Sequence, residues 1–100
     1  MSDYISTIAT EICELVPATQ RPGTDDDLRL FRLYAVLALV KGTDVSAEDV
    51  HDAWCAWIVD QDPDHQALVP YAMLGADQQR QDEPFVRAIV AVASVINRSR

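Results

Sequence analysis

Apolar residues recur at intervals of three and four along two stretches in the first half of the chain, residues 3–16 and residues 25–41. This spacing places the apolar side chains on one face of an α-helix. Residues 17–23, which separate the two stretches, include two prolines and a glycine, a composition typical of a loop. The pattern therefore predicts a helical pair over residues 3–42.

The second of these helices has clear start and stop signals. Thr24 can accept a backbone hydrogen bond as the N-cap, and the three aspartates that follow it lie where the positive end of the helix dipole favours carboxylates. Gly42 ends the helix. Few polar residues occur between Leu33 and Val40, so this helix is expected to be the central and most buried one.

Two more helices are predicted in the second half of the chain. Ser46 and Asp49 have the spacing of a capping box ahead of the third helix, which should end before Pro63. The last helix should begin after Asp82, with Pro84 in its first turn. The apolar positions of both helices again recur at intervals of three and four.

The stretch Leu68-Val-Pro-Tyr71 between them is too short for a helix and contains a proline, so it is predicted to be an extended segment or an edge strand. The predicted fold class is mainly all-α, a compact bundle of about four helices with one short extended segment around residues 68–71. One hundred residues suffice for one hydrophobic core and not for two. We therefore expect a single domain over residues 1–100.

The charge balance limits the partners. The chain has 16 acidic and 8 basic residues, a net charge of −8 at pH 7, which repels phosphates, so nucleic acid is not an expected partner. The longest apolar stretch, Leu33 to Val40, is far shorter than the ~20 residues that a membrane span needs. With no basic, apolar leader at its start, the chain is expected to be cytoplasmic, without a membrane partner.

Part of the sequence resembles the ryanodine receptor repeat, a family that includes small stand-alone domains of bacteria and phages. The resemblance rests on His51-Asp-Ala-Trp54, on His65-Gln-Ala-Leu-Val-Pro-Tyr71, and on Leu74 and Asp82. It covers residues 45–96, although the chain lacks the family's Gly-Trp-x-Tyr-Gly stretch, and Gln66 replaces a proline. The resemblance implies a nucleotide-derived ligand, and the whole chain is also similar to short proteins of actinobacteria and their phages.

Catalytic and metal sites are not expected. Cys55 lies between two tryptophans in an apolar run, where a buried thiol is a better interpretation than a nucleophile. His51 and Cys55 share a helix face, but no ligand pair has the short spacing of a zinc site. No glycine-rich phosphate loop occurs. We therefore predict a protein that is not an enzyme and has no metal or cofactor.

The aromatic residues of the second half could line a groove for a planar ligand, with histidine and arginine side chains as polar contacts. The alternative is that these aromatics form the core between the third helix, the extended segment and the last helix. The candidate ligand-binding residues are His51, Trp54, Trp57, His65, Tyr71 and Arg87.

Two other functions compete with this one. The acidic clusters at residues 25–27, 48–49 and 60–64 could contact a basic protein partner, as in an interaction module or an inhibitor. The last helix carries Val86, Val90 and Val95 in addition to its inward stripe. A helix that is apolar on more than one side can be covered by a second copy of the chain, which would make the protein a self-associating homodimer.

Overall fold

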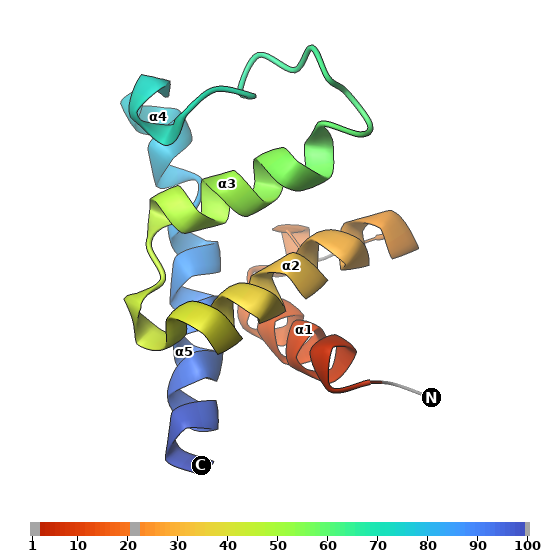
Figure 1. The fold of residues 1–100 in the computed structure, drawn as a ribbon, viewed down its shortest axis with the longest axis vertical. Helices are drawn as coiled ribbons and strands as arrows, with labels where there is room; N and C mark the ends of the chain where they lie inside the picture. The colour runs from red at the N-terminus through yellow and green to blue at the C-terminus, as the bar shows by residue number, and fades with distance from the viewer. Residues whose placement is uncertain (1–2, 21–22, 100) are drawn as a thin grey trace.

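A computed structural model describes residues 3–20 and 23–99 of the chain (Figure 1). Two residues of the predicted 17–23 loop, 21 and 22, lie outside the described part. The described residues form α1 (Tyr4–Leu15), η1 (Ala18–Gln20), α2 (Asp25–Lys41), η2 (Gly42–Asp44), α3 (Ala47–Ile58), η3 (Tyr71–Met73), α4 (Ala76–Arg80) and α5 (Glu83–Ser99). The predicted fold class, a small all-α bundle with four main helices, is confirmed.

Local capping determines where α1 and α2 begin and end. Asp3 caps α1 by accepting the Ser6 N–H at 2.8 Å, and Thr24 Oγ1 accepts the Asp27 N–H at 3.2 Å at the start of α2. Gly42 follows α2 with φ +60°, a left-handed conformation that glycine adopts without a steric cost. The stop signal predicted after Lys41 is therefore confirmed.

The predicted capping box at the start of α3 is present in both directions. Asp49 N–H donates to Ser46 Oγ at 3.3 Å, and Ser46 N–H donates to Asp49 Oδ2 at 2.9 Å. These bonds satisfy two backbone groups that would otherwise have no helical partner.

Replacing Ser46 with alanine is therefore expected to lower the free energy of unfolding by about 1 kcal/mol, the usual effect of removing an N-cap. Urea unfolding followed by far-UV circular dichroism measures the loss. Ser46→Thr, which keeps a hydroxyl at the cap, should recover most of the stability. Equal stability of the alanine variant and the wild type would contradict this role of Ser46.

The core lies where α2 packs against α1, α3 and α5 (Figure 1). Its most completely buried large side chains are Ile12, Tyr34, Val50 and Ile89, one from each of these helices. The prediction that α2 is central is therefore confirmed. The second half of α2 has more exposed positions than the apolar pattern predicts, because Leu33, Val36 and Val40 are 36%, 43% and 70% exposed on its outer side.

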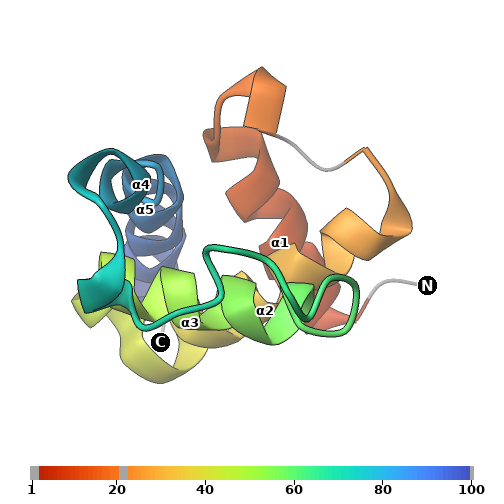
Figure 2. The same ribbon diagram turned by 90° about the horizontal axis from the view of Figure 1, so that it is seen from above.

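The segment after α3 differs from the prediction for residues 68–71. The described residues include no strand, and residues 68–70 are irregular. Tyr71 begins η3, where the Met73 N–H donates to the Pro70 carbonyl at 2.8 Å. Figure 2 shows this segment running beside α3 before it turns into α4, which stands next to the start of α5. The α4 helix was not predicted, because five residues are too few to show a helical period.

The last helix begins after Asp82 as predicted, and the Val86 N–H donates to the Asp82 carbonyl at 3.0 Å. Two of its additional valines, Val86 and Val90, pack against the core of their own chain. Val95 is 55% exposed. The α5 surface therefore leaves less apolar area for a second copy than the sequence pattern indicated. Within the described part of the chain, no helix has the length and apolar character that crossing a membrane requires.

Candidate functional site

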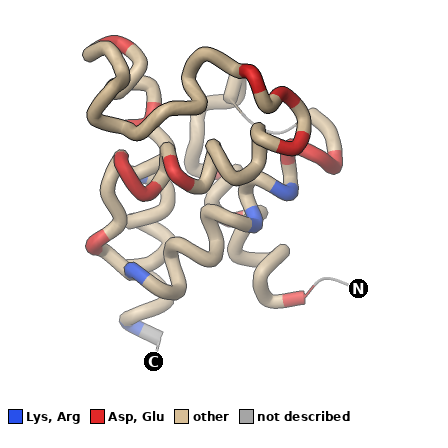
Figure 3. The backbone as a smooth tube through the Cα atoms, turned by 45° about the horizontal axis from the view of Figure 1, so that its top comes forward, with Lys and Arg blue, Asp and Glu red and all other residues tan. Residues whose placement is uncertain are grey.

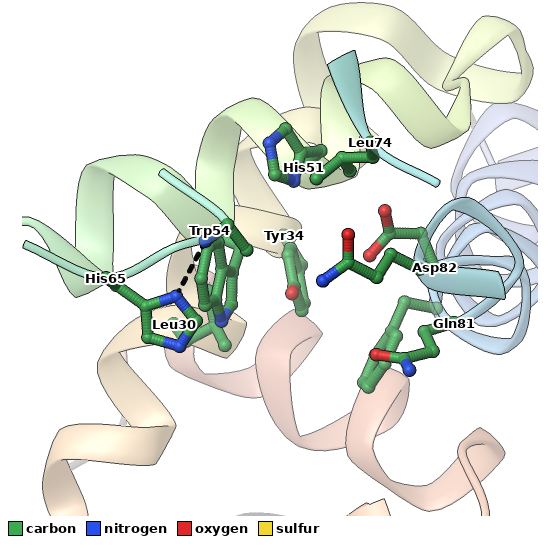
Figure 4. Close-up of a pocket in the computed structure, with 11 residues that line it drawn as sticks. Leu30, Tyr34, His51, Trp54, His65, Leu74, Gln81 and Asp82 are labelled. Carbon is green, nitrogen blue, oxygen red and sulfur yellow. Dashed lines mark hydrogen bonds between the residues drawn. The ribbon is translucent and has the colours of Figure 1, made fainter. Parts of the chain in front are cut away.

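A cavity of about 340 Å³ lies between α2, α3, the segment after α3, α4 and the start of α5 (Figure 4). The lining side chains come from both halves of the chain, from Leu30 in α2 to Phe85 in α5. The lining residues are Leu30, Tyr34, His51, Trp54, His65, Ala67, Leu74, Gln78, Gln81, Asp82 and Phe85. This cavity is the candidate site.

His51 holds the segment after α3 against that helix. The residue is 3% exposed, and its Nε2 lies 2.6 Å from the Val69 carbonyl oxygen. Because a carbonyl oxygen can only accept, Nε2 carries the hydrogen and donates it. The His51 ring also stacks on Trp54, with ring centroids 5.8 Å apart and an interplanar angle of 22°. His51 therefore orients Trp54 and closes one side of the cavity.

His65 meets Trp54 from the segment after α3. Its ring contacts the indole edge-on, with centroids 5.0 Å apart at 82°. His65 Nδ1 accepts the Ala67 N–H at 3.0 Å, the bond dashed in Figure 4. In the neutral ring, the hydrogen must then be on Nε2, which is a donor. The tertiary structure thus brings His51 and His65 against the same indole.

Tyr34 and Phe85 form the wall nearest the core. Their rings contact each other with centroids 5.6 Å apart at 44°, and Tyr34 is buried. Burial raises the pKa of the Tyr34 hydroxyl, and the negative charge of Asp82 raises it further. The hydroxyl therefore stays protonated, and its ring offers an uncharged aromatic surface.

Among the described residues, Asp82 is the only carboxylate that lines the cavity, and no lysine or arginine lines it. Figure 4 shows its side chain reaching from the start of α5 toward the side occupied by His51 and Leu74. Burial raises the pKa of Asp82, and the charge of His51 acts in the opposite direction. Gln78 and Gln81, from α4 and the turn after it, add amides that can both donate and accept.

The structure gathers some of the predicted ligand-binding residues and separates others. His51, Trp54 and His65 line the cavity. Tyr71 packs on His51 behind it, with ring centroids 6.2 Å apart. Trp57 and Arg87, which were predicted to lie around the same groove, do not line this cavity.

Helix geometry explains why Trp57 and Arg87 lie outside the cavity. Trp57 is nearly one turn beyond Trp54, where its indole N–H donates to the Asp26 carbonyl at 2.8 Å, at the start of α2. Arg87 is five residues beyond Asp82 and thus about 140° round the helix. It is exposed there and pairs with Glu83 at 3.8 Å.

Three polar residues of the cavity, Gln78, Gln81 and Asp82, are not identified as site residues by the sequence pattern. Asp82 has two roles in the sequence pattern, as a helix start and as part of the ryanodine-repeat resemblance, and neither places it in a cavity. Gln78 and Gln81 belong to α4 and its turn, which show no periodic signal. Leu30 and Tyr34 face the cavity from α2. They were indistinguishable from its other apolar positions, because periodicity gives the buried face and not what that face covers.

Cys55 has the environment of a thiol and not of a thiolate. Desolvation raises its pKa first, and the charges of Asp52 and Asp82 raise it further. Its Sγ lies 3.3 Å from His51 Nε2, the nitrogen that already donates to Val69. Between residues 3 and 99, with 21–22 set aside, no group of three or more metal-ligating side chains is arranged to hold an ion.

Comparison with known proteins assigns the chain to a family. No curated protein and no solved structure matches the chain. The resemblance of residues 45–96 to the ryanodine receptor repeat stays a prediction. A family described as "Domain of unknown function (DUF7701)" matches residues 3–94, nearly the whole chain, and the protein therefore belongs to this family.

Proposed function

We propose that this domain is a non-enzymatic binding module that holds the planar, nitrogen-containing ring of a small molecule in the cavity beside Trp54. The observation that carries the proposal is the cavity itself, about 340 Å³ in volume and walled by Tyr34, Trp54 and Phe85. Small-molecule sites are typically concave and mostly apolar, with a few convergent polar groups and volumes of roughly 300–1,000 Å³. This cavity lies within that range of volumes, and its eleven lining residues comprise six apolar or aromatic ones and five polar ones.

The polar groups at the rim favour the edge of a nucleobase-like ring. A carboxylate at Asp82 accepts hydrogen bonds from an amino group, and the amides of Gln78 and Gln81 can pair with ring nitrogens or carbonyls. Aromatic side chains contact a flat ring by stacking or edge-on. A base or nucleoside therefore fits both the walls and the rim.

The charges of the cavity and of the whole chain disfavour highly phosphorylated ligands. Among the residues that the structure describes, no lysine or arginine lines the cavity, and the chain carries a net charge of −8. A phosphate inside the cavity would meet the Asp82 carboxylate, and the described lining offers no permanently charged lysine or arginine to offset the repulsion. If the ligand is derived from a nucleotide, its base enters the cavity and any phosphate stays in the solvent.

Thermal shift with adenine, adenosine, AMP, cyclic AMP and ATP tests the proposal, because a ligand that binds only the folded state raises the melting temperature. Tryptophan fluorescence in a Trp57→Phe background reports on Trp54 alone. We expect saturable changes with the base or the nucleoside and weaker ones with ATP. No shift with any of the five compounds would contradict a nucleobase-like ligand.

The variant Asp82→Asn tests whether the charge of Asp82 contributes to ligand binding. It keeps the shape of the side chain and removes the charge, so affinity for the amino-bearing ring should fall about tenfold, as expected for losing a charge-assisted hydrogen bond. Arg87→Gln, on the outer face of the same helix, is the matched control and should bind like the wild type. Equal affinities for all three proteins would exclude Asp82 from recognition.

A further inference from the structure

A second hollow lies on the outer side of the molecule, between the first half of α2 and the end of α3. It measures about 440 Å³, and Leu33, Ala56 and Trp57 form its apolar part. Asp26, Arg29, Asp60 and Gln61 stand around it. None of these residues lines the cavity beside Trp54, so the two hollows are separate.

The hollow lies between α2 and α3, which pack against each other in antiparallel directions. At one end the Trp57 indole N–H donates to the Asp26 carbonyl at 2.8 Å. At the other end the Lys41 ammonium lies 3.5 Å from the Asp49 carboxylate. These two contacts hold α2 and α3 side by side. The hollow is therefore a groove between the outer faces of the two helices, and Trp57 forms part of its wall.

The groove continues into an exposed apolar stripe on α2. Leu33, Val36 and Val40 are spaced by three and four residues and therefore lie along one side of the helix. They span about 10 Å of helix length, close to two turns. Single exposed apolar residues are ordinary, but a contiguous stripe beside a hollow is typical of an interaction surface.

Acidic residues surround the end of the groove that Trp57 closes. The Trp57–Asp26 bond places the start of α2 beside the segment that follows α3, so Asp25 and Asp26 lie near the 60–64 segment with its three aspartates. In Figure 3, backbone segments coloured for acidic residues lie close together at one corner of the molecule. Arg29 is the basic residue in the groove, and its guanidinium lies 3.7 Å from the Asp26 carboxylate. The corner is therefore strongly negative.

We propose that this groove binds an amphipathic helix of another protein, with an apolar stripe against Leu33, Val36 and Val40 and with lysines or arginines facing the acidic corner. Helices commonly bind in such grooves through apolar residues at i, i+3, i+4 and i+7. A second copy of this chain fits less well. A two-fold contact brings the same patch to both sides, and each partner carries a net charge of −8. This surface goes beyond the proposed small-molecule site and does not depend on it.

The test uses a fluorescein-labelled helical peptide of about four turns, with leucines at i, i+3, i+4 and i+7 and lysines elsewhere. Fluorescence anisotropy should show saturable binding to the wild-type protein. The affinity should weaken as sodium chloride is raised, because salt screens exposed charges. A peptide with glutamate in place of each lysine should not bind. Absence of binding by the lysine peptide would overturn the proposal.

Matched variants separate the groove from general attraction to an acidic protein. Leu33→Asn combined with Val36→Asn leaves the net charge unchanged and should reduce affinity about tenfold or more, as loss of central apolar anchors does. Leu15→Asn combined with Met73→Asn changes two exposed apolar residues elsewhere and should bind like the wild type. Equal affinities of the two double variants would overturn the proposal.

Neutralising the corner gives an independent test. Asp60→Asn combined with Asp62→Asn should flatten the salt dependence more than Glu11→Gln combined with Asp44→Asn, which changes the net charge equally. An identical salt dependence would exclude the acidic corner from the site.

Light scattering of the protein alone tests whether a second copy of the chain occupies the groove instead. A dimer that dissociates in the Leu33→Asn, Val36→Asn variant would assign the groove to self-association and overturn the proposal.

Discussion

Replacing Ile89 with alanine is expected to lower the free energy of unfolding by about 2–5 kcal/mol. Ile89 is fully buried near the middle of α5, where the helix packs on α1, α2 and α3. Removing its side chain loses apolar burial and leaves a cavity that the surrounding helices fill only in part. Domains are stable by only about 5–15 kcal/mol, so this one change should remove a large share of the stability.

Val95→Ala is the matched control on the same helix. Its side chain is 55% exposed, and replacement should change stability by no more than about 0.5 kcal/mol. Urea unfolding at neutral pH, followed by circular dichroism, compares the two variants with the wild type. Similar losses in both variants would mean that α5 does not bury the face that carries Ile89.

The second large effect is expected at high pH. Burial raises the pKa of the Tyr34 hydroxyl in the folded protein above its ordinary value of 10.0. Above about pH 10 the unfolded chain therefore releases this proton while the folded chain keeps it. Stability falls with pH wherever the unfolded state binds fewer protons. Tyr34 thus contributes stability that is complete below pH 10 and is lost as the pH rises further.

Tyr34→Phe removes this ionisation while keeping the ring that packs on Phe31 and Phe85. Thermal melts between about pH 8 and pH 11.5 should show a steeper loss of melting temperature in the wild type than in this variant. Tyr4→Phe changes an exposed ring and should follow the wild-type curve. Parallel curves for Tyr34→Phe and the wild type would show that the hydroxyl is not held in a buried environment.

The two proposed surfaces share one helix. Trp54 faces the inner cavity, and Trp57, nearly one turn later on α3, lines the outer groove. From the sequence, both indoles are candidates for one groove. The separation follows from their partners, since His51 and His65 contact Trp54 while the start of α2 binds Trp57. Each tryptophan can therefore report on one surface alone.

Features that act within one helical turn could be predicted from the sequence. The caps at Thr24 and Ser46 and the stop at Gly42 depend on side chains and backbone groups that are three or four residues apart or closer. The four main helices have apolar periods long enough to recognise. The all-α class and the approximate bounds of these helices therefore follow from the chain itself.

Only the tertiary structure decided what each helix face covers. The same apolar spacing describes Tyr34, which is buried, and Val40, which is 70% exposed. In the same way, Asp82 lines a cavity together with Leu30, Tyr34 and Trp54, which come from α2 and α3. Burial depends on the elements that arrive from elsewhere in the chain, and a local pattern contains no information on their position. The helices were thus set by local sequence, whereas the cavity, the groove and the separation of the two tryptophans came from long-range packing.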